Sequence, residues 1–121
     1  MLFIYYIYYN YNGDGMKLSD GKKDISLYEC KSFYKRFMGF MGKRSINIAL
    51  LFNKCNSIHT FFMKEKIDVI MCNSDNKILY YYQNLDKNRI ILPKKGVKKV
   101  FETPSSYFDI EIGKKMIINE N

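Results

Sequence analysis

The stretch His59-Thr-Phe-Phe-Met-Lys-Glu-Lys-Ile-Asp-Val-Ile-Met71 decides how the rest of this chain is interpreted. Two apolar runs flank the charged triplet Lys64-Glu65-Lys66, and the second run carries Asp68 one residue after it begins. His59 is the only histidine among the 121 residues. We therefore expect a central hairpin here, and any chemistry that the chain performs should involve it.

The length and composition indicate one folded domain. A chain of 121 residues suffices for one hydrophobic core. A hydrophobic fraction of 47% with 17% aromatic residues excludes intrinsic disorder. The aromatic residues are Tyr and Phe without Trp, and both types favour β-strands.

Short apolar runs separated by turn residues extend outward from the central stretch. They predict strands at Ile25–Cys30, Ile46–Phe52, Ser57–Met63, Ile67–Cys72, Ile78–Gln83, Ile90–Leu92, Val97–Thr103 and Lys115–Ile118. The third, fourth and fifth of these runs should form an antiparallel meander, because short loops join them.

One helix is expected. Ser32 occupies an N-cap position, and Phe33, Phe37 and Met41 recur at helical spacing, which predicts a short α-helix near residues 32–41. The expected fold is therefore mainly β, a β-sandwich or partly open barrel of antiparallel strands with one short helix.

Residues 1–15 form a low-complexity segment without a basic residue, unlike a secretory signal. Because Met16 resembles a natural start, we expect residues 1–15 to be a mis-called or disordered extension and residues 16–121 to be a single domain. An edge strand is the alternative, since Tyr and Ile runs have high β propensity.

The charge and cysteine content bear on partners and compartment. The formal charge of +8 comes mainly from Lys, with Arg only at positions 36, 44 and 89, so specific nucleic-acid recognition is not favoured. Three cysteines without a CxxC pair suit a reducing cytoplasm better than a disulfide framework. No apolar run approaches the about 20 residues of a membrane-spanning helix.

Several short motifs occur in order along the chain. They are Arg36-Phe-Met-Gly-Phe-Met41, His59-Thr-Phe-Phe-Met63, Ile67-Asp-Val69 and Val100-Phe-Glu-Thr-Pro104. Together they resemble the family named domain of unknown function 192 (DUF192), from Met16 nearly to the end of the chain. The resemblance implies a compact β fold with one helix and no established reaction, cofactor or substrate. The chain departs from the family pattern at Phe62, where Trp is usual, at Lys66-Ile67 in place of Pro-Leu, and at Lys114 in place of Asp.

His59 is the first candidate for a functional residue, because imidazole titrates near neutral pH. A general base needs a proton donor within reach, and a metal ligand needs companions such as Cys55 and Cys72. The favoured interpretation is a half-buried histidine that hydrogen-bonds the backbone beside Phe61.

The role of Asp68 depends on strand register. If Met63 pairs with Ile67, Asp68 and His59 lie on opposite sheet faces, whereas a slip by one residue places them on the same face. A carboxylate inside an apolar strand needs hydrogen bonds. A structural pair with Arg36 or a backbone-capping role is favoured, and a binding role is the alternative.

The candidate binding residues are Arg36, Met41, His59, Phe61, Met63 and Asp68. We predict a module that binds an unknown small ligand or protein partner, without an assigned catalytic residue, metal or cofactor. The alternatives are a hydrolase that uses His59 with Asp68, or a weak binder of nucleic acid or anionic surfaces. Glu102 is expected to be a strand-end polar group, and the lysines at positions 94–99 a solvated loop.

Overall fold

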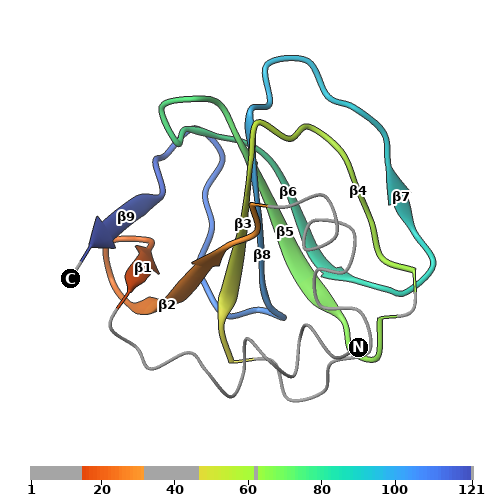
Figure 1. The fold of residues 1–121 in the computed structure, drawn as a ribbon, viewed down its shortest axis with the longest axis horizontal. Helices are drawn as coiled ribbons and strands as arrows, with labels where there is room; N and C mark the ends of the chain where they lie inside the picture. The colour runs from red at the N-terminus through yellow and green to blue at the C-terminus, as the bar shows by residue number, and fades with distance from the viewer. Residues whose placement is uncertain (1–14, 32–46, 62, 121) are drawn as a thin grey trace.

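A computed structural model describes residues 15–31, 47–61 and 63–120 of the chain (Figure 1). The described residues contain nine strands and no helix. The strands are β1 (Met16–Ser19), β2 (Asp24–Glu29), β3 (Ala49–Asn53), β4 (Ile58–His59), β5 (Ile67–Cys72), β6 (Ile78–Leu85), β7 (Ile90–Ile91), β8 (Lys99–Pro104) and β9 (Ile117–Glu120). The helix predicted near residues 32–41 lies outside the described residues. So does the predicted extension, apart from residue 15.

Seven strands form one sheet in the order β6-β5-β8-β3-β2-β1-β9, and β4 pairs with β7 in a second, small sheet. The large sheet is mixed, because β2 and β3 run parallel whereas its other neighbours are antiparallel. The expectation of antiparallel strands throughout is therefore wrong at this pair. Parallel neighbours need a crossover connection longer than a hairpin turn, and residues 30–48 join these two strands.

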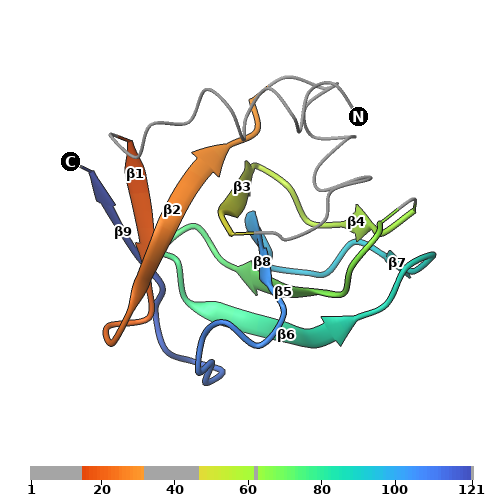
Figure 2. The ribbon, with the colours of Figure 1, turned by 90° about the horizontal axis from the view of Figure 1, so that it is seen from below.

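The two edge strands of the large sheet approach each other at one end. Ile78 at the start of β6 donates its N–H to the carbonyl of Lys114 at 2.8 Å, and Met116 before β9 donates to the carbonyl of Asn76 at 2.9 Å. These bonds connect β6 with the segment that leads into β9. The sheet consequently curves, and β4 and β7 lie at the other end of the molecule from β1 and β9 (Figures 1 and 2).

Hydrophobic side chains form a cluster on each face of the large sheet. The first core contains Leu18, Ile25, Leu27, Ala49, Leu51, Ile70, Cys72, Ile78, Phe101, Phe108 and Met116. The second core contains Cys30, Leu50, Phe52, Met63, Ile67, Val69, Met71, Ile91, Val97 and Val100. All six residues of β5 are buried, because its alternate side chains enter the two cores. This double burial explains why the run that predicted β5 with its observed bounds is apolar at every position except Asp68.

The predicted hairpin between the two halves of the opening stretch does not form. β5 pairs with β6 and β8, whereas β4 belongs to the small sheet with β7. Asn73 closes the β5–β6 turn, because its side-chain oxygen accepts the N–H groups of Asp75 and Lys77. The meander prediction is therefore correct for β5 and β6 and wrong for β4.

The strand predicted over residues 57–63 is reduced to Ile58–His59. Thr60 ends the regular pairing, because its hydroxyl donates to the Asp86 carbonyl at 2.7 Å and accepts the Arg89 N–H at 2.8 Å. Met63 then turns back, its N–H donating to the Thr60 carbonyl at 3.3 Å. β1 was not expected as a strand, although it pairs with β2 and β9.

Candidate functional site

Asp68 lies in β5, next to the edge strand β6 of the large sheet, and both oxygens of its carboxylate accept hydrogen bonds. It accepts the Tyr81 hydroxyl at 2.6 Å, the Asn84 N–H at 2.9 Å and the Ser106 N–H at 2.9 Å. Burial and the Asp68 carboxylate both raise the pKa of Tyr81, which keeps its hydroxyl proton available for this bond. Two of the three donors are backbone N–H groups, from Asn84 near the end of β6 and from Ser106 after β8, so these contacts support the backbone-capping role expected for Asp68.

Asp68 and His59 lie on opposite sides of the large sheet. Asp68 bonds Tyr81, whose register partner Ile70 belongs to the first core. The small sheet that carries His59 packs against the second core through Ile58 and Ile91. A hydrolase that pairs these two side chains would need them on one face, so the hydrolase hypothesis has no geometric support here.

His59 is half-buried and contacts the next residues of its own chain. Its Nδ1 accepts the Phe61 N–H at 3.3 Å, and the two rings stack with centroids 5.2 Å apart. This is the backbone hydrogen bond beside Phe61 that the sequence predicted. Its acceptor role means that Nδ1 carries no proton in this arrangement.

The outward face of the small sheet forms an apolar surface. Ile58 and Ile91 are register partners that point to the second core, so their neighbours His59 and Ile90 point outward. Phe61 stacks on His59, and Leu92 lies two residues beyond Ile90. We call His59, Phe61, Ile90 and Leu92 the outer patch. Phe61 is 37% exposed, Ile90 60% and Leu92 68%.

Basic residues flank the outer patch in the adjoining loops. Residues 64–66, 86–89 and 94–95 contain six basic and two acidic side chains, a net charge of +4. They are Lys64, Lys66, Lys87, Arg89, Lys94 and Lys95, against Glu65 and Asp86. All are exposed except Lys94, which is half-exposed. The patch therefore combines apolar side chains with a positive surround.

The other predicted binding residues occupy different positions. Met63 is buried in the second core beneath the small sheet, so it supports the patch without being accessible. Arg36 and Met41 lie outside the described residues.

Glu102 has a more unusual environment than the sequence predicted. It lies inside β8, not at a strand end, and is only 4% exposed. Burial raises the pKa of its carboxyl to about 8. The alternation of Val100 and Glu102 in one strand was the available signal, because it places the carboxyl on the same face as a core residue.

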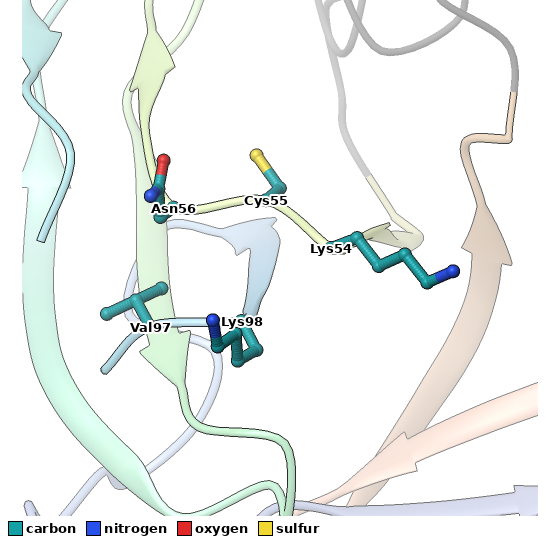
Figure 3. Close-up of a pocket in the computed structure, with 5 residues that line it drawn as sticks. All are labelled: Lys54, Cys55, Asn56, Val97 and Lys98. Carbon is teal, nitrogen blue, oxygen red and sulfur yellow. The ribbon is translucent and has the colours of Figure 1, made fainter. Parts of the chain in front are cut away.

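A small cavity of about 250 Å³ lies between the β3–β4 and β7–β8 loops, lined by Lys54, Cys55, Asn56, Val97 and Lys98 (Figure 3). Figure 3 shows the Lys54 side chain extending away from Lys98, so the two ammonium groups do not converge on one anion. The Cys55 thiol donates to the Ser57 carbonyl at 3.1 Å. The cavity is smaller than the about 300 Å³ at which typical ligand pockets begin.

Metal-ligating side chains do not gather in the described part of the chain, where no three His, Cys, Asp or Glu residues form a suitable group. Cys72 belongs to the first core, whereas Cys55 packs against the second. Burial raises the pKa of the Cys72 thiol to about 12, which disfavours the thiolate that a metal needs. No helix in the described residues is long and apolar enough to cross a membrane.

Comparison with known proteins agrees with the resemblance seen in the motifs. Residues 16–118 match the model of DUF192, described as "Uncharacterized ACR, COG1430". The chain belongs to the DUF192 family. A UPF0127 protein from Thermococcus sibiricus is 37% identical over 91 residues, 68% of this chain and 58% of the relative. A UPF0127 protein from Pyrococcus furiosus is 33% identical over 110 residues, 84% of this chain and 94% of the relative.

The chain spans between 50% and 58% of the length of the three Thermococcus relatives that it matches. Among solved structures, a protein of unknown function from Novosphingobium aromaticivorans has a TM-score of 0.70 at 13% identity, over 85% of this chain and 83% of that one. This similarity concerns the fold alone. No activity is established for the UPF0127 relatives.

Proposed function

We propose that this DUF192 domain is a binding module whose outer patch receives a segment of a partner protein that combines apolar and acidic side chains. The observation that carries the proposal is the exposure of Ile90 and Leu92 next to the His59–Phe61 stack. Single exposed apolar side chains are common on protein surfaces, whereas a group of them is typical of interaction sites. Ile90 pairs with His59 in the small sheet, and Phe61 and Leu92 lie within two residues of the ends of its two strands.

The charge around the patch supports an acidic partner. The net charge of +4 in the adjoining loops has the same sign as the +8 of the whole chain. Complementary charge increases association rates and discriminates against basic partners. Nucleic acid remains the weaker alternative, because the centre of the patch is aliphatic and offers no bidentate reader of bases.

The proposal gives the predicted binding residues different roles. His59 and Phe61 belong to the binding surface, Met63 supports it from the second core, and Asp68 belongs to the fold. Arg36 and Met41 stay predictions.

Three further expectations accompany the proposal. The curved large sheet is a partly open barrel, supported by the bonds between the β6 and β9 ends. Residues 16–121 form one domain, supported by the family match over residues 16–118. The protein acts in the cytoplasm, supported by three cysteines that form no disulfide in the described structure.

A random twelve-residue peptide library displayed on phage tests the partner chemistry. We expect the selected peptides to be enriched in Asp or Glu together with Leu, Ile or Phe. They should fail to bind the double variant Ile90→Ser/Leu92→Ser. The matched control is Ile112→Ser/Ile117→Ser, which removes two exposed apolar side chains far from the small sheet and should bind as wild type does. Peptides rich in Lys or Arg, or equal binding by both variants, would refute the proposal.

A further inference from the structure

The Glu102 side chain points into the second core. In β8 it lies opposite Leu50 of β3 and Val69 of β5, and register partners share a sheet face. Both partners are fully buried members of the second core, as is Val100 two residues earlier. The carboxyl group therefore lies at the centre of an apolar face.

No described residue compensates this carboxyl. Its Oε1 is buried and has no hydrogen-bond partner within the described structure. The charged groups of the neighbouring strands are directed elsewhere, since Asp68 bonds donors on the first-core side and Lys99 donates to the Asn76 side chain at 2.8 Å.

Among the residues that the structure describes, the titratable side chains that pack in the second core belong to types that are neutral when protonated. They are Tyr28, Cys30, Cys55 and Tyr82. The lysines of the adjoining loops that the structure describes, among them Lys64, Lys66 and Lys98, are exposed. An ionised carboxylate at this position is therefore unfavourable, which is why burial raises the pKa of Glu102 to about 8.

The small sheet depends on the same core. Its strands have two residues each, and Ile58 and Ile91 attach it to the second core. Outside these strands it is held by the bonds of Thr60 with Asp86, Asn88 and Arg89 and by the Lys94 N–H, which donates to the Asn56 carbonyl. Short elements with few anchoring groups open at lower free energy than central strands. Water that enters the second core to solvate a carboxylate would loosen this sheet before β5 or β8.

We propose that Glu102 is a proton-sensitive control of the outer patch: its neutral carboxyl lets the small sheet pack on the second core, and its ionisation releases that sheet. This inference rests on the proposed function, because the small sheet carries the patch. The proton leaves the Glu102 carboxyl for solvent when the core opens. A partner that needs the packed sheet would then bind more weakly as the pH rises through 8.

Amide hydrogen exchange of the free protein tests this control without any partner. The Thr60 N–H, which donates to the Arg89 carbonyl at 2.9 Å, reports the small sheet, and the Ile70 N–H reports the centre of the large sheet. Protection factors corrected for intrinsic exchange are measured from pH 5 to pH 8 in wild type and in Glu102→Gln.

We expect Thr60 to be less protected than Ile70 and to lose about tenfold in protection per pH unit, the slope for one proton released on opening. In Glu102→Gln this slope should disappear. Equal protection of Thr60 and Ile70, a Thr60 slope near zero in wild type, or the same slope in the variant would each refute the control. The peptide experiment can fail while this one succeeds, so the two proposals are separable.

Discussion

The substitution Asp68→Asn measures the structural role that we assign to this carboxylate. Asn keeps the shape of the side chain but replaces one acceptor oxygen with an NH2 group, which then faces a donor. Oδ2 accepts the Tyr81 hydroxyl and the Ser106 N–H, and Oδ1 accepts the Asn84 N–H. Either orientation of the amide therefore loses at least one bond and creates a donor–donor contact.

Hydrogen bonds to charged groups contribute about 1.5–3 kcal/mol each. Asn84 and Ser106 are exposed residues, so their N–H groups can regain water and the full sum of three bonds will not be lost. We expect Asp68→Asn to lower the free energy of unfolding by about 2–4 kcal/mol, as for other disrupted buried networks. Tyr81→Phe removes one donor only and should cost about 1.5–3 kcal/mol, the range for a single hydrogen bond to a charged group.

Urea denaturation followed by circular dichroism measures both changes. A loss below about 0.5 kcal/mol for Asp68→Asn, the range of an ordinary surface substitution, would refute the capping role. The double variant with His59→Ala adds a test of geometry. Because the two side chains occupy opposite faces, their effects should add within about 0.5 kcal/mol, whereas a larger coupling would show that they interact.

Three further predictions concern the small sheet, the cysteines and Glu102. Thr60→Val removes the bonds to Asp86 and Arg89 and should cost about 2 kcal/mol, and an unchanged urea midpoint would contradict that role. In native protein at pH 8, iodoacetamide should leave Cys72 unmodified by mass spectrometry, because burial raises the pKa of its thiol to about 12; modification without denaturant would contradict its burial. Wild type should lose up to about 5 kcal/mol of unfolding free energy between pH 4.5 and 8, since burial raises the pKa of Glu102 from its ordinary value of 4.5 to about 8 and each unit corresponds to about 1.36 kcal/mol. In this pH window Glu102 keeps its proton in the folded state and loses it in the unfolded chain, so the free energy of unfolding falls as the pH rises. Glu102→Gln should abolish this dependence when both proteins are unfolded with urea at each pH.

The sequence predicted best those elements whose pattern has one physical explanation. β5 was predicted with its observed bounds, because a six-residue run that is apolar except for Asp68 suits a strand buried on both faces. The capping role of Asp68 followed from the rule that a buried carboxylate needs donors. The backbone bond to His59 was predicted from its position beside Phe61.

The errors arose where long-range pairing overrides local pattern. Nothing near His59 indicates that β4 pairs with β7, about thirty residues later, because the deciding contacts are the Thr60 bonds to Asp86 and Arg89. Similarly, the sequence could not show that the Glu102 carboxyl is buried without a hydrogen-bond partner, because its environment depends on β3 and β5, which are distant in sequence. Hydrophobic alternation also does not predict that β2 and β3 run parallel, because it shows which side chains share a face and not the direction of the neighbouring strand.

The binding role of the outer patch is tested most directly by isothermal titration of one library-selected acidic peptide into three proteins. These are wild type, Ile90→Ser/Leu92→Ser and Ile112→Ser/Ile117→Ser. Removing two exposed aliphatic anchors should weaken the peptide at least about tenfold, equivalent to about 1.4 kcal/mol, while the control variant should stay within about twofold of wild type, or about 0.4 kcal/mol. Equal dissociation constants for the two double variants would contradict a binding site on the small sheet.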